Sequence, residues 1–347
     1  MGMNGTMTAE LDAIAYQMVA DGKGILAADE STATIKKRFD AIGVENTEDN
    51  RRDYRELLFR AKPAMRDYIS GVILFDETIR QKAKDGTPLV DLITASGSLP
   101  GIKVDCGAKP LAFCPGETVT EGLDGLGERL KAYYALGARF AKWRAVIDIA
   151  GRAVPSYTAL RSNAHALARY AALCQENKIV PIVEPEVLMD GSHDLDRCYE
   201  ATQWALKIVF EELYYQRVRL EGMVLKPNMV VPGKASGTQA SIAEVAEKTV
   251  RVLKSCVPAT VPGIAFLSGG QSDEDATAHL DAMVKQGNLP WKLTYSYGRA
   301  LQAAPQKAWS GKAENAAAAQ AAFTHRARMN SLAAKGQWSA ALEKAAA

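Results

Sequence analysis

The sequence predicts an α/β protein whose parallel strands close into a barrel. Short runs rich in Val, Ile, Leu and Phe recur eight times, and each is followed by a longer stretch with the apolar spacing of a helix. The runs begin 28 to 47 residues apart, which leaves room each time for a helix and a return loop. Eight such units indicate a (β/α)8 TIM barrel, which commonly uses about 250 residues. We therefore expect a single domain over residues 1–347.

Predicted strands and helices alternate along the chain. The strands are Gly24–Asp29, Gly71–Phe75, Gly101–Asp105, Phe140–Ile147, Ile179–Glu186, Gly222–Met229, Ile264–Gly269 and Lys292–Gly298. The helices with the clearest apolar spacing are Leu160–Glu176, Asp194–Arg217, Ser241–Lys254 and Ser272–Gln286. A doubly wound open sheet is the alternative fold, but it normally carries a glycine-rich fingerprint after its first strand, and this sequence has none there.

Further helices are expected before and after the barrel strands, which span about residues 24–298. Ala9–Ala20 is expected as an N-terminal helix that covers the barrel floor. Arg299–Trp309 and Ala313–Lys335 are expected as extra C-terminal helices within 299–347. The last dozen residues are rich in alanine, which buries little area, and are expected to lack fixed structure.

Composition excludes several classes of protein. The 42 Lys+Arg and 40 Asp+Glu give a net charge of +2, too weak to indicate a nucleic-acid partner. No apolar run reaches the roughly 18 residues of a membrane span, and Met1–Thr8 lacks the pattern of a secretory signal. Five scattered cysteines indicate reduced thiols, and four histidines form no local metal motif. We expect a cytoplasmic protein without a metal.

Charged residues occur in or at the end of strands that a barrel buries on both sides. They are Asp29, Lys103, Asp105, Lys142, Arg144, Glu184, Glu186 and Lys226. Each one alone could be a salt-bridged residue at a strand end. Burying the whole set would cost several kcal/mol per group unless the groups pair, and a purely structural core is better filled with Leu or Val. The set therefore indicates an active site at the mouth of the barrel.

Three lysines beside three carboxylates favour amine catalysis on a carbonyl. A lysine attacks only when it is neutral, and its ordinary pKa of about 10.4 leaves few neutral molecules at pH 7. A second cation and burial lower the pKa of a catalytic lysine to roughly 7–8. Lys142, which we place on an adjacent strand, is expected to act in this way on Lys226. Asp29, Glu184 and Glu186 are then available to move protons.

Two regions resemble anion sites. Residues 267–271 (LSGGQ) follow the seventh strand and residues 296–299 (SYGR) follow the eighth, where barrels often bind phosphate. The expected phosphate contacts there are the backbone N–H groups of Gly269, Gly270 and Gly298, a serine hydroxyl and the Arg299 guanidinium. A second cluster after the first strand contains Ser31, Thr34 and residues 36–38 (KKR); it is a second phosphate site or a solvated helix face.

Long strings at these positions resemble one family, the class I (Schiff-base) fructose-1,6-bisphosphate aldolases. The resemblance runs from about Gly22 to Gly336. The matching strings are GKGILAADEST (22–32), GVILFDET (71–78), GIKVD (101–105), FAKWR (140–144), IVPIVEPE (179–186), LKPNMV (225–230), FLSGGQS (266–272) and SYGRALQ (296–302).

The resemblance implies a role for each matching residue. Lys226 forms the imine with the C2 ketone, Glu184 assists loss of water from the carbinolamine, and Asp29 handles the proton of the C4 hydroxyl. The supporting and channel-lining residues are Glu186, Lys142, Lys103 and Arg144. The C1 phosphate is assigned to Ser268, Gly269, Gly270, Ser296, Gly298 and Arg299, and the C6 phosphate to Ser31, Thr34, Arg38 and Lys103.

The family also implies reversible cleavage of a sugar bisphosphate without metal or cofactor, in a homotetramer. The imine serves as the electron sink that a zinc ion would otherwise supply. Many relatives carry a tail tyrosine that exchanges protons at the enamine, whereas the last tyrosine here is Tyr297, so we expect another donor or slower protonation. The alternatives are a Schiff-base aldolase for a sugar monophosphate and a non-enzymatic binding role.

Overall fold

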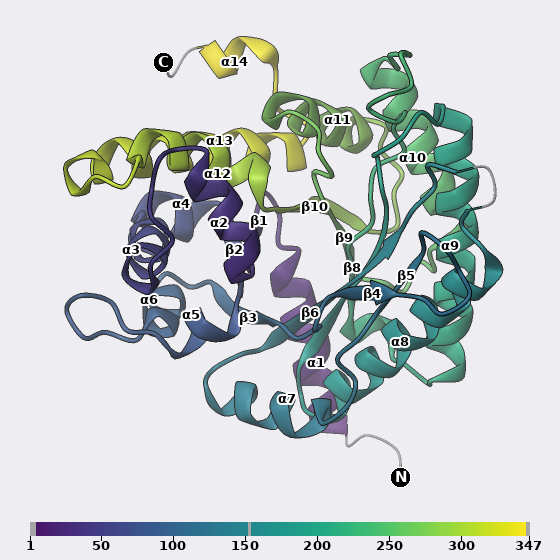
Figure 1. The fold of residues 1–347 in the computed structure, drawn as a ribbon, viewed down its shortest axis with the longest axis horizontal. Coiled ribbons are helices and arrows are strands. Elements are labelled where there is room, and N and C mark those ends of the chain that lie inside the picture. Colours follow the sequence, from purple (N-terminus) through teal and green to yellow (C-terminus); the bar gives the residue numbers. More distant parts are fainter. Residues whose placement is uncertain (1–4, 152–153, 345–347) are drawn as a thin grey trace.

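Residues 5–151 and 154–344 are described by the computed structural model (Figure 1). Within this part of the chain, eight parallel strands close into a barrel in the order β1-β10-β9-β8-β7-β6-β3-β2. The strands are β1 (Gly24–Ala28), β2 (Ile69–Leu74), β3 (Leu99–Lys103), β6 (Phe140–Ile147), β7 (Val180–Val187), β8 (Val224–Leu225), β9 (Gly263–Phe266) and β10 (Lys292–Tyr297). The predicted (β/α)8 TIM barrel is confirmed.

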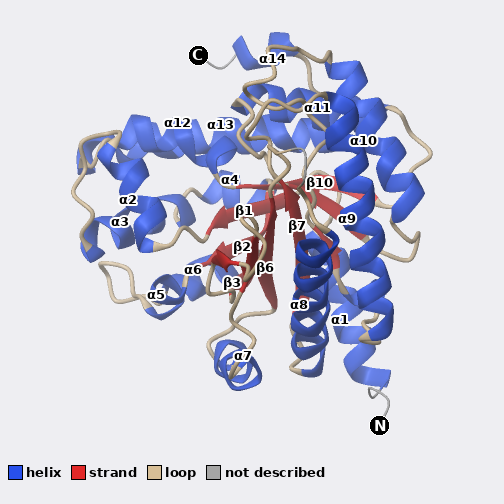
Figure 2. Cartoon of the chain, turned by 45° about the vertical axis from the view of Figure 1, so that its right-hand side comes forward, coloured by secondary structure: helices blue, strands red, loops and turns tan. Residues whose placement is uncertain are grey.

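Helices surround the barrel on its outer side (Figure 2). Those that connect barrel strands are α2 (Thr32–Asp40), α3 (Glu48–Phe59), α4 (Lys62–Asp67), α5 (Asp76–Arg80), α6 (Leu89–Ala95), α7 (Leu126–Ala135), α8 (Tyr157–Glu176), α9 (Leu195–Tyr215), the 3-10 helix η1 (Leu220–Gly222), α10 (Ile242–Cys256) and α11 (Asp273–Lys285). No helix in the two described ranges is both long enough and apolar enough to cross a membrane.

Helix starts follow from side-chain caps that the sequence reveals. Ser241 caps α10 in a reciprocal capping box with Glu244, and the Ser272 hydroxyl accepts the Asp275 N–H at 3.1 Å at the start of α11. The four helices predicted from apolar spacing are therefore found with their ends within three residues.

Strand β8 is much shorter than the predicted Gly222–Met229. Gly222 belongs to η1 instead, and Pro227 has no N–H to donate to a neighbouring strand. Only Val224 and Leu225 pair with β7, through Ile182 and Val183. Lys226 thus lies just beyond the last paired residue of its strand.

A small antiparallel hairpin was not predicted. It consists of β4 (Ala108–Pro110) and β5 (Thr118–Thr120), which pair between β3 and α7. Its strands have only three residues each; β4 is exposed and β5 is half-buried to buried. Neither strand is long enough to show the apolar alternation that predicts a strand. The Thr120 hydroxyl donates to the Arg144 carbonyl at 2.7 Å, which fixes the hairpin beside the carboxyl end of β6.

Helix α1 (Gly5–Met18) closes the floor of the barrel, as predicted for Ala9–Ala20. Its residues Leu11 and Met18 are fully buried in one apolar cluster with barrel residues that include Phe140. The Phe140 ring fills the barrel so closely that a Cβ added at Gly71 would lie 2.8 Å from the ring, and one at Gly101 closer still. These two glycines on β2 and β3 are needed because Phe140 on β6 fills the space that their side chains would occupy.

The C-terminal segment packs as helices against the barrel. The helices are α12 (Arg299–Trp309), the 3-10 helix η2 (Ala313–Asn315), α13 (Ala316–Ala334) and α14 (Ala340–Lys344). The prediction of a last dozen residues without structure is wrong for α14. Glu343 pairs with Arg326 at 2.6 Å and with His325 at 3.1 Å, so a charged contact replaces the apolar area that alanine does not supply. Residues 345–347 lie outside the described part.

Candidate active site

The predicted site residues meet in one cavity of about 750 Å³ at the carboxyl ends of the barrel strands. All but two of the sixteen line it: Asp29, Ser31, Thr34, Arg38, Lys103, Lys142, Arg144, Glu184, Glu186, Lys226, Ser268, Gly269, Ser296 and Gly298. The other two, Gly270 and Arg299, line an adjoining cavity of about 430 Å³ together with Ser268 and Gly269. Strand-end position in the sequence therefore predicted which residues meet in these cavities.

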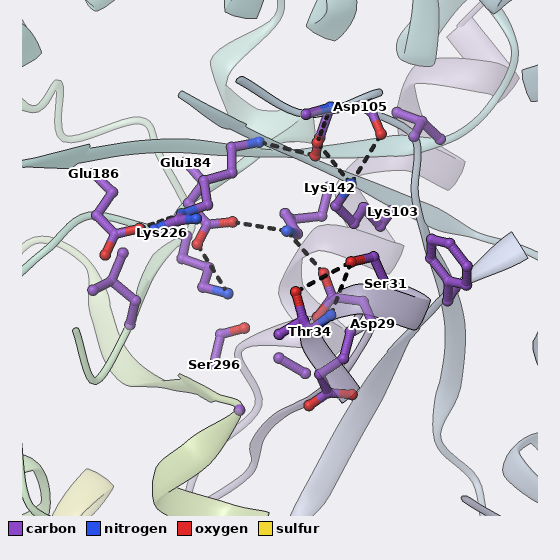
Figure 3. Close-up of a pocket in the computed structure, with 18 of the residues that line it drawn as sticks. Asp29, Ser31, Thr34, Lys103, Asp105, Lys142, Glu184, Glu186, Lys226 and Ser296 are labelled. Carbon is purple, nitrogen blue, oxygen red and sulfur yellow. Dashed lines mark hydrogen bonds and ion pairs between the residues drawn. The ribbon is translucent and has the colours of Figure 1, made fainter. Parts of the chain in front are cut away.

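Four largely buried titratable side chains form a continuous row across this cavity (Figure 3). The Lys142 Nζ lies 2.8 Å from Asp29 Oδ2 and 3.5 Å from Glu184 Oε2. The other oxygen of Glu184, Oε1, lies 3.2 Å from the Lys226 Nζ. Glu184 on β7 thus lies between the amino groups of two lysines, Lys142 from β6 and Lys226 from the end of β8.

Strand order corrects one expectation. Strand β7 lies between β6 and β8, so the prediction that Lys142 and Lys226 occupy adjacent strands is wrong. The register places Lys142 beside Ile182 and Arg144 beside Glu184, and the Lys226 N–H donates to the Val183 carbonyl at 2.8 Å. The backbone ladder thereby positions Glu184 between the two lysines.

The charges in the row stabilise one another. Burial would lower the pKa of Lys142, but the carboxylates of Asp29 and Glu184 outweigh burial and raise that pKa well above its ordinary value. Burial would also raise the pKa of Asp29, but the positive charges of Lys142 and Lys226 lower it to about 2. At neutral pH, Lys142 is a cation and Asp29 an anion.

Two further ion pairs flank the row. Lys103 Nζ lies 2.7 Å from Asp105 Oδ1, and Asp105 is in turn fixed by the Gly107 N–H at 3.1 Å. Arg144 pairs with Glu186 on the neighbouring strand through a short Nε contact. Both pairs line the cavity, so each presents a cation and an anion to whatever binds there.

The loop after β9 has the geometry of an anion site. Gly269 and Gly270 have φ angles of 48° and 89°, a left-handed conformation that favours glycine. The buried hydroxyl of Ser296 at the end of β10 has no hydrogen-bond partner among the described residues. The loop, the hydroxyl and the nearby guanidinium of Arg299 surround space that an anion can fill.

The start of α2 brings a second group of polar side chains to the cavity. Ser31 caps the helix, and its hydroxyl lies 3.1 Å from that of Thr34. The Arg38 side chain reaches the residue that follows β10, because a Cβ at Gly298 would lie only 3.6 Å from the Arg38 Nη2. Arg38 also lines the adjoining cavity with Ser268 and Gly269. Lys36 pairs with Asp40 at 2.7 Å on the helix surface, so this residue of the predicted basic cluster is the solvated helix face.

Sequence reasoning gave no role to three charged residues of the candidate site. Buried Glu30 pairs with Arg38, Asp105 pairs with Lys103, and the Lys234 Nζ lies where a Cβ at Gly270 would come within 2.7 Å of it. Asp105 was one of the strand-end charges that indicated the site, but no role was assigned to it. Glu30 and Lys234 lie beyond strand ends in segments without periodicity, so no pattern distinguished them from surface charges.

Comparison with known proteins gives one family. Residues 10–347 match the family described as "Fructose-bisphosphate aldolase class-I". A "probable fructose-bisphosphate aldolase class 1" from Xanthomonas axonopodis pv. citri is 61% identical over 330 residues, covering 95% of this chain and 98% of the relative. "Fructose-bisphosphate aldolase 4, cytosolic" from Arabidopsis thaliana is 55% identical, covering 95% and 84%.

A solved structure agrees in fold as well as in sequence. It is the fructose-bisphosphate aldolase of Plasmodium falciparum in a complex with TRAP and a small-molecule inhibitor. The two chains superpose with a TM-score of 0.95 at 47% identity, over 98% of each chain.

Proposed function

This chain belongs to the class I fructose-bisphosphate aldolase family, and we propose that Lys226 is the amine that forms its covalent intermediate. The enzyme is a lyase that reversibly cleaves fructose 1,6-bisphosphate to dihydroxyacetone phosphate and glyceraldehyde 3-phosphate, a step of glycolysis and gluconeogenesis. Enzymes of this class use a lysine Schiff base and need no metal or cofactor.

Formation of the imine requires an amine and a proton donor. In our proposal the neutral Lys226 amine attacks the C2 ketone and gives a carbinolamine, whose hydroxyl must leave as water. Glu184, whose Oε1 is 3.2 Å from the Lys226 Nζ, is the proposed acid that protonates this hydroxyl. The contact of Glu184 with both Lys226 and Lys142 is the observation that carries this assignment.

Cleavage of the C3–C4 bond then requires a base and an electron sink. We propose that the Asp29 carboxylate accepts the proton of the C4 hydroxyl, since Asp29 is ionised at neutral pH. The electron pair of the broken bond moves into the protonated imine on Lys226 and forms an enamine. Lys142 supports the step because its fixed positive charge holds Asp29 and Glu184 in place.

The substrate's two phosphates are proposed to occupy the two polar ends of the cavity. The C1 phosphate is assigned to Ser268, Gly269, Gly270, Ser296, Gly298 and Arg299, and the C6 phosphate to Ser31, Thr34, Arg38 and Lys103. Arg144 and Glu186 line the path between these ends. The position of Arg38 next to Gly298 supports its contact with either phosphate.

Borohydride trapping tests the assignment of Lys226. Reduction in the presence of dihydroxyacetone phosphate is expected to leave one covalent adduct, which peptide mapping locates at Lys226. The Lys226→Arg variant is expected to form no adduct and to lose on the order of 10³-fold or more in kcat. The control variant is Lys292→Met, which changes an exposed lysine at the start of β10, at the other end of the barrel. This variant is expected to keep both the adduct on Lys226 and the kcat of the parent. An adduct on Lys142, or turnover abolished by a chelator without any adduct, would refute the proposal.

We also propose a single folding domain, a cytoplasmic location and a homotetrameric assembly. The Arabidopsis relative is named as cytosolic, which supports the location. Exposed aromatic side chains on α8 and α9 support assembly: Tyr157, Trp204, Tyr214 and Tyr215 are all at least 40% exposed, and the rings of Tyr157 and Trp204 stack on each other. The rings of Tyr214 and Tyr215 form a second pair, and exposed aromatic pairs of this kind are typical of interfaces.

A further inference from the structure

The cavity that adjoins the active site is strongly cationic. Among the described residues, its lining includes five cations, Lys37, Arg38, Arg144, Lys234 and Arg299, and two carboxylates, Glu186 and Asp190. Arg38 and Arg144 are paired with the buried carboxylates of Glu30 and Glu186. Lys234 is held by a weaker contact, since its partner Asp190 is 70% exposed.

The ammonium of Lys234 rests against the glycine loop that follows β9. A Cβ added at Gly270 would lie 2.7 Å from the Lys234 Nζ and 2.8 Å from its Cε. Gly270 belongs to this loop and has a φ of 89°, which favours glycine. Because glycine has no side chain, the lysine lies directly against the backbone of the loop. A cation at this distance lies within reach of an anion that the loop binds.

The backbone of Lys234 is fixed by the loop that follows β7. The Lys234 N–H donates to the Met189 carbonyl at 2.9 Å, and the flanking N–H groups of Gly233 and Ala235 donate to the carbonyls of His193 and Gly191, both at 2.8 Å. Gly233 is required there, because a Cβ would clash with the Gly191 carbonyl. Hydrogen bonds between the loops that follow β7 and β8 therefore hold the Lys234 side chain next to the glycine loop after β9.

The partner of Lys234 is easily exchanged. Lys234 Nζ lies 3.2 Å from Asp190 Oδ1, and the two side chains are 47% and 70% exposed. Such an exposed pair contributes only about 0–1 kcal/mol. A phosphate dianion carries more charge than a carboxylate and would be held by the loop at the same time.

We propose that Lys234 is a further binding residue for the C1 phosphate, and that its ammonium moves from Asp190 to this phosphate when substrate binds. The inference rests on the proposed function of Ser268, Gly269, Gly270 and Arg299 as the C1-phosphate site. Asp190 then competes with the phosphate for Lys234 and lowers the affinity of the free enzyme for phosphorylated ketones.

The synthesis direction separates the two phosphates, because dihydroxyacetone phosphate supplies the C1 phosphate and glyceraldehyde 3-phosphate the C6 phosphate. With the second substrate saturating, Lys234→Met is expected to raise KM for dihydroxyacetone phosphate about 5-fold to 10-fold. KM for glyceraldehyde 3-phosphate is expected to change less than about 2-fold, and Lys234→Arg is expected to restore most of the loss. An unchanged KM for dihydroxyacetone phosphate, or an equal rise for both substrates, overturns the inference.

The variant Asp190→Asn gives the opposite expectation. Removal of the competing carboxylate is expected to lower KM for dihydroxyacetone phosphate about 2-fold, and to have no effect in the Lys234→Met background. If Asp190→Asn lowers this KM equally in the parent and in Lys234→Met, the proposal that Lys234 moves from Asp190 to the phosphate is refuted. The matched control is Lys292→Met, whose lysine pairs with Asp21 at 2.5 Å and is expected to leave both KM values unchanged.

A further variant, Arg299→Gln, separates this inference from the proposed function. If Arg299→Gln raises KM for dihydroxyacetone phosphate and Lys234→Met does not, only the role of Lys234 is refuted. If neither variant changes it, the proposed C1-phosphate site is refuted as well.

Discussion

At the residue scale, the central feature is one ammonium group between two carboxylates. Lys142 contacts Asp29 and Glu184, and Glu184 also contacts Lys226. Breaking a buried network by removing one member leaves an uncompensated charge and is strongly destabilising. Lys142 therefore holds the proposed acid and base in place and keeps Asp29 ionised.

The pH dependence of stability tests the contacts of Asp29. Its pKa is lowered from 3.8 to about 2, so its stabilising contribution is fully present above pH 3.8 and is lost as the pH falls to 2. The Asp29→Asn variant lacks this contribution. We expect its free energy of unfolding to be lower than that of the parent by about 2 kcal/mol at pH 7, with the difference vanishing toward pH 2.

Denaturant unfolding at several pH values measures this difference. A matched variant, Asp21→Asn, changes an exposed carboxylate at the other end of the barrel and is expected to show almost no difference at either pH. A gap between the Asp29→Asn variant and the parent that stays constant down to pH 2 would contradict the lowered pKa.

The sequence predicted which charged residues at strand ends meet in the candidate site. Asp29, Lys142, Glu184 and Lys226 were found because a charge in a buried strand requires an explanation. Lys234 was not found, because its position depends on hydrogen bonds between two loops that no local pattern records.

At the element scale, proline sets where two strands stop pairing. Pro185 lies in β7 and Pro227 follows β8, and neither has an N–H to donate. Pairing between these strands ends at Val183 and Leu225, one residue before Glu184 and Lys226. Glu184 stays paired with Arg144 on β6, and the Lys226 N–H still donates to the Val183 carbonyl. The proline after each of these two charged residues thus ends the β7–β8 ladder directly beyond them.

The fit between β3 and β6 is tested by substitution of a glycine. Gly101→Ala is expected to lower the free energy of unfolding by about 1–3 kcal/mol, because the added Cβ would clash with the Phe140 ring. The loss should be smaller in a Phe140→Leu background, where the ring is absent. Denaturant unfolding of the two single variants and the double variant measures this coupling.

The control is Gly127→Ala in α7, where a Cβ would meet nothing within 4 Å. It is expected to raise stability by up to about 1 kcal/mol, since alanine favours helix over glycine. If Gly101→Ala lowers the free energy of unfolding equally in the parent and in the Phe140→Leu variant, the Phe140 ring is not what excludes a side chain at position 101.

The ends of helices could be predicted where the sequence carries a capping residue or a long stretch of apolar residues at helical spacing. Ser241 and Ser272 mark their helices in the sequence and in the structure. The β4–β5 hairpin and α14 were missed, because contacts distant in sequence hold them: Thr120 to Arg144, and Glu343 to Arg326.

At the scale of the whole molecule, the barrel followed from repetition alone. Eight apolar runs separated by helical stretches allow few parallel arrangements, and the structure and the aldolase relatives agree with the closed one. How copies of the chain assemble could not be predicted in the same way, because exposed aromatic residues have no characteristic period.

Assembly is tested by charging the exposed aromatic face. The unmodified chain is expected to sediment as a homotetramer, and the double variant Trp204→Lys with Tyr215→Lys as a smaller species, because charge disfavours an apolar contact. Tyr16→Lys on α1 is the control, since Tyr16 is similarly exposed and lies outside α8 and α9. A double variant that remains tetrameric would place the interface elsewhere.

Barrel closure imposes an order of events on synthesis. Strand β1 completes the barrel by pairing Ile25 with Ser296 of β10, some 270 residues later in the chain. At about 5–20 residues per second, a ribosome needs roughly 15–55 s to supply that partner. During that interval one edge of the nascent sheet has no native neighbour, and such edges are prone to aggregate. This enzyme is therefore expected to need protection by chaperones most just before its last strand emerges.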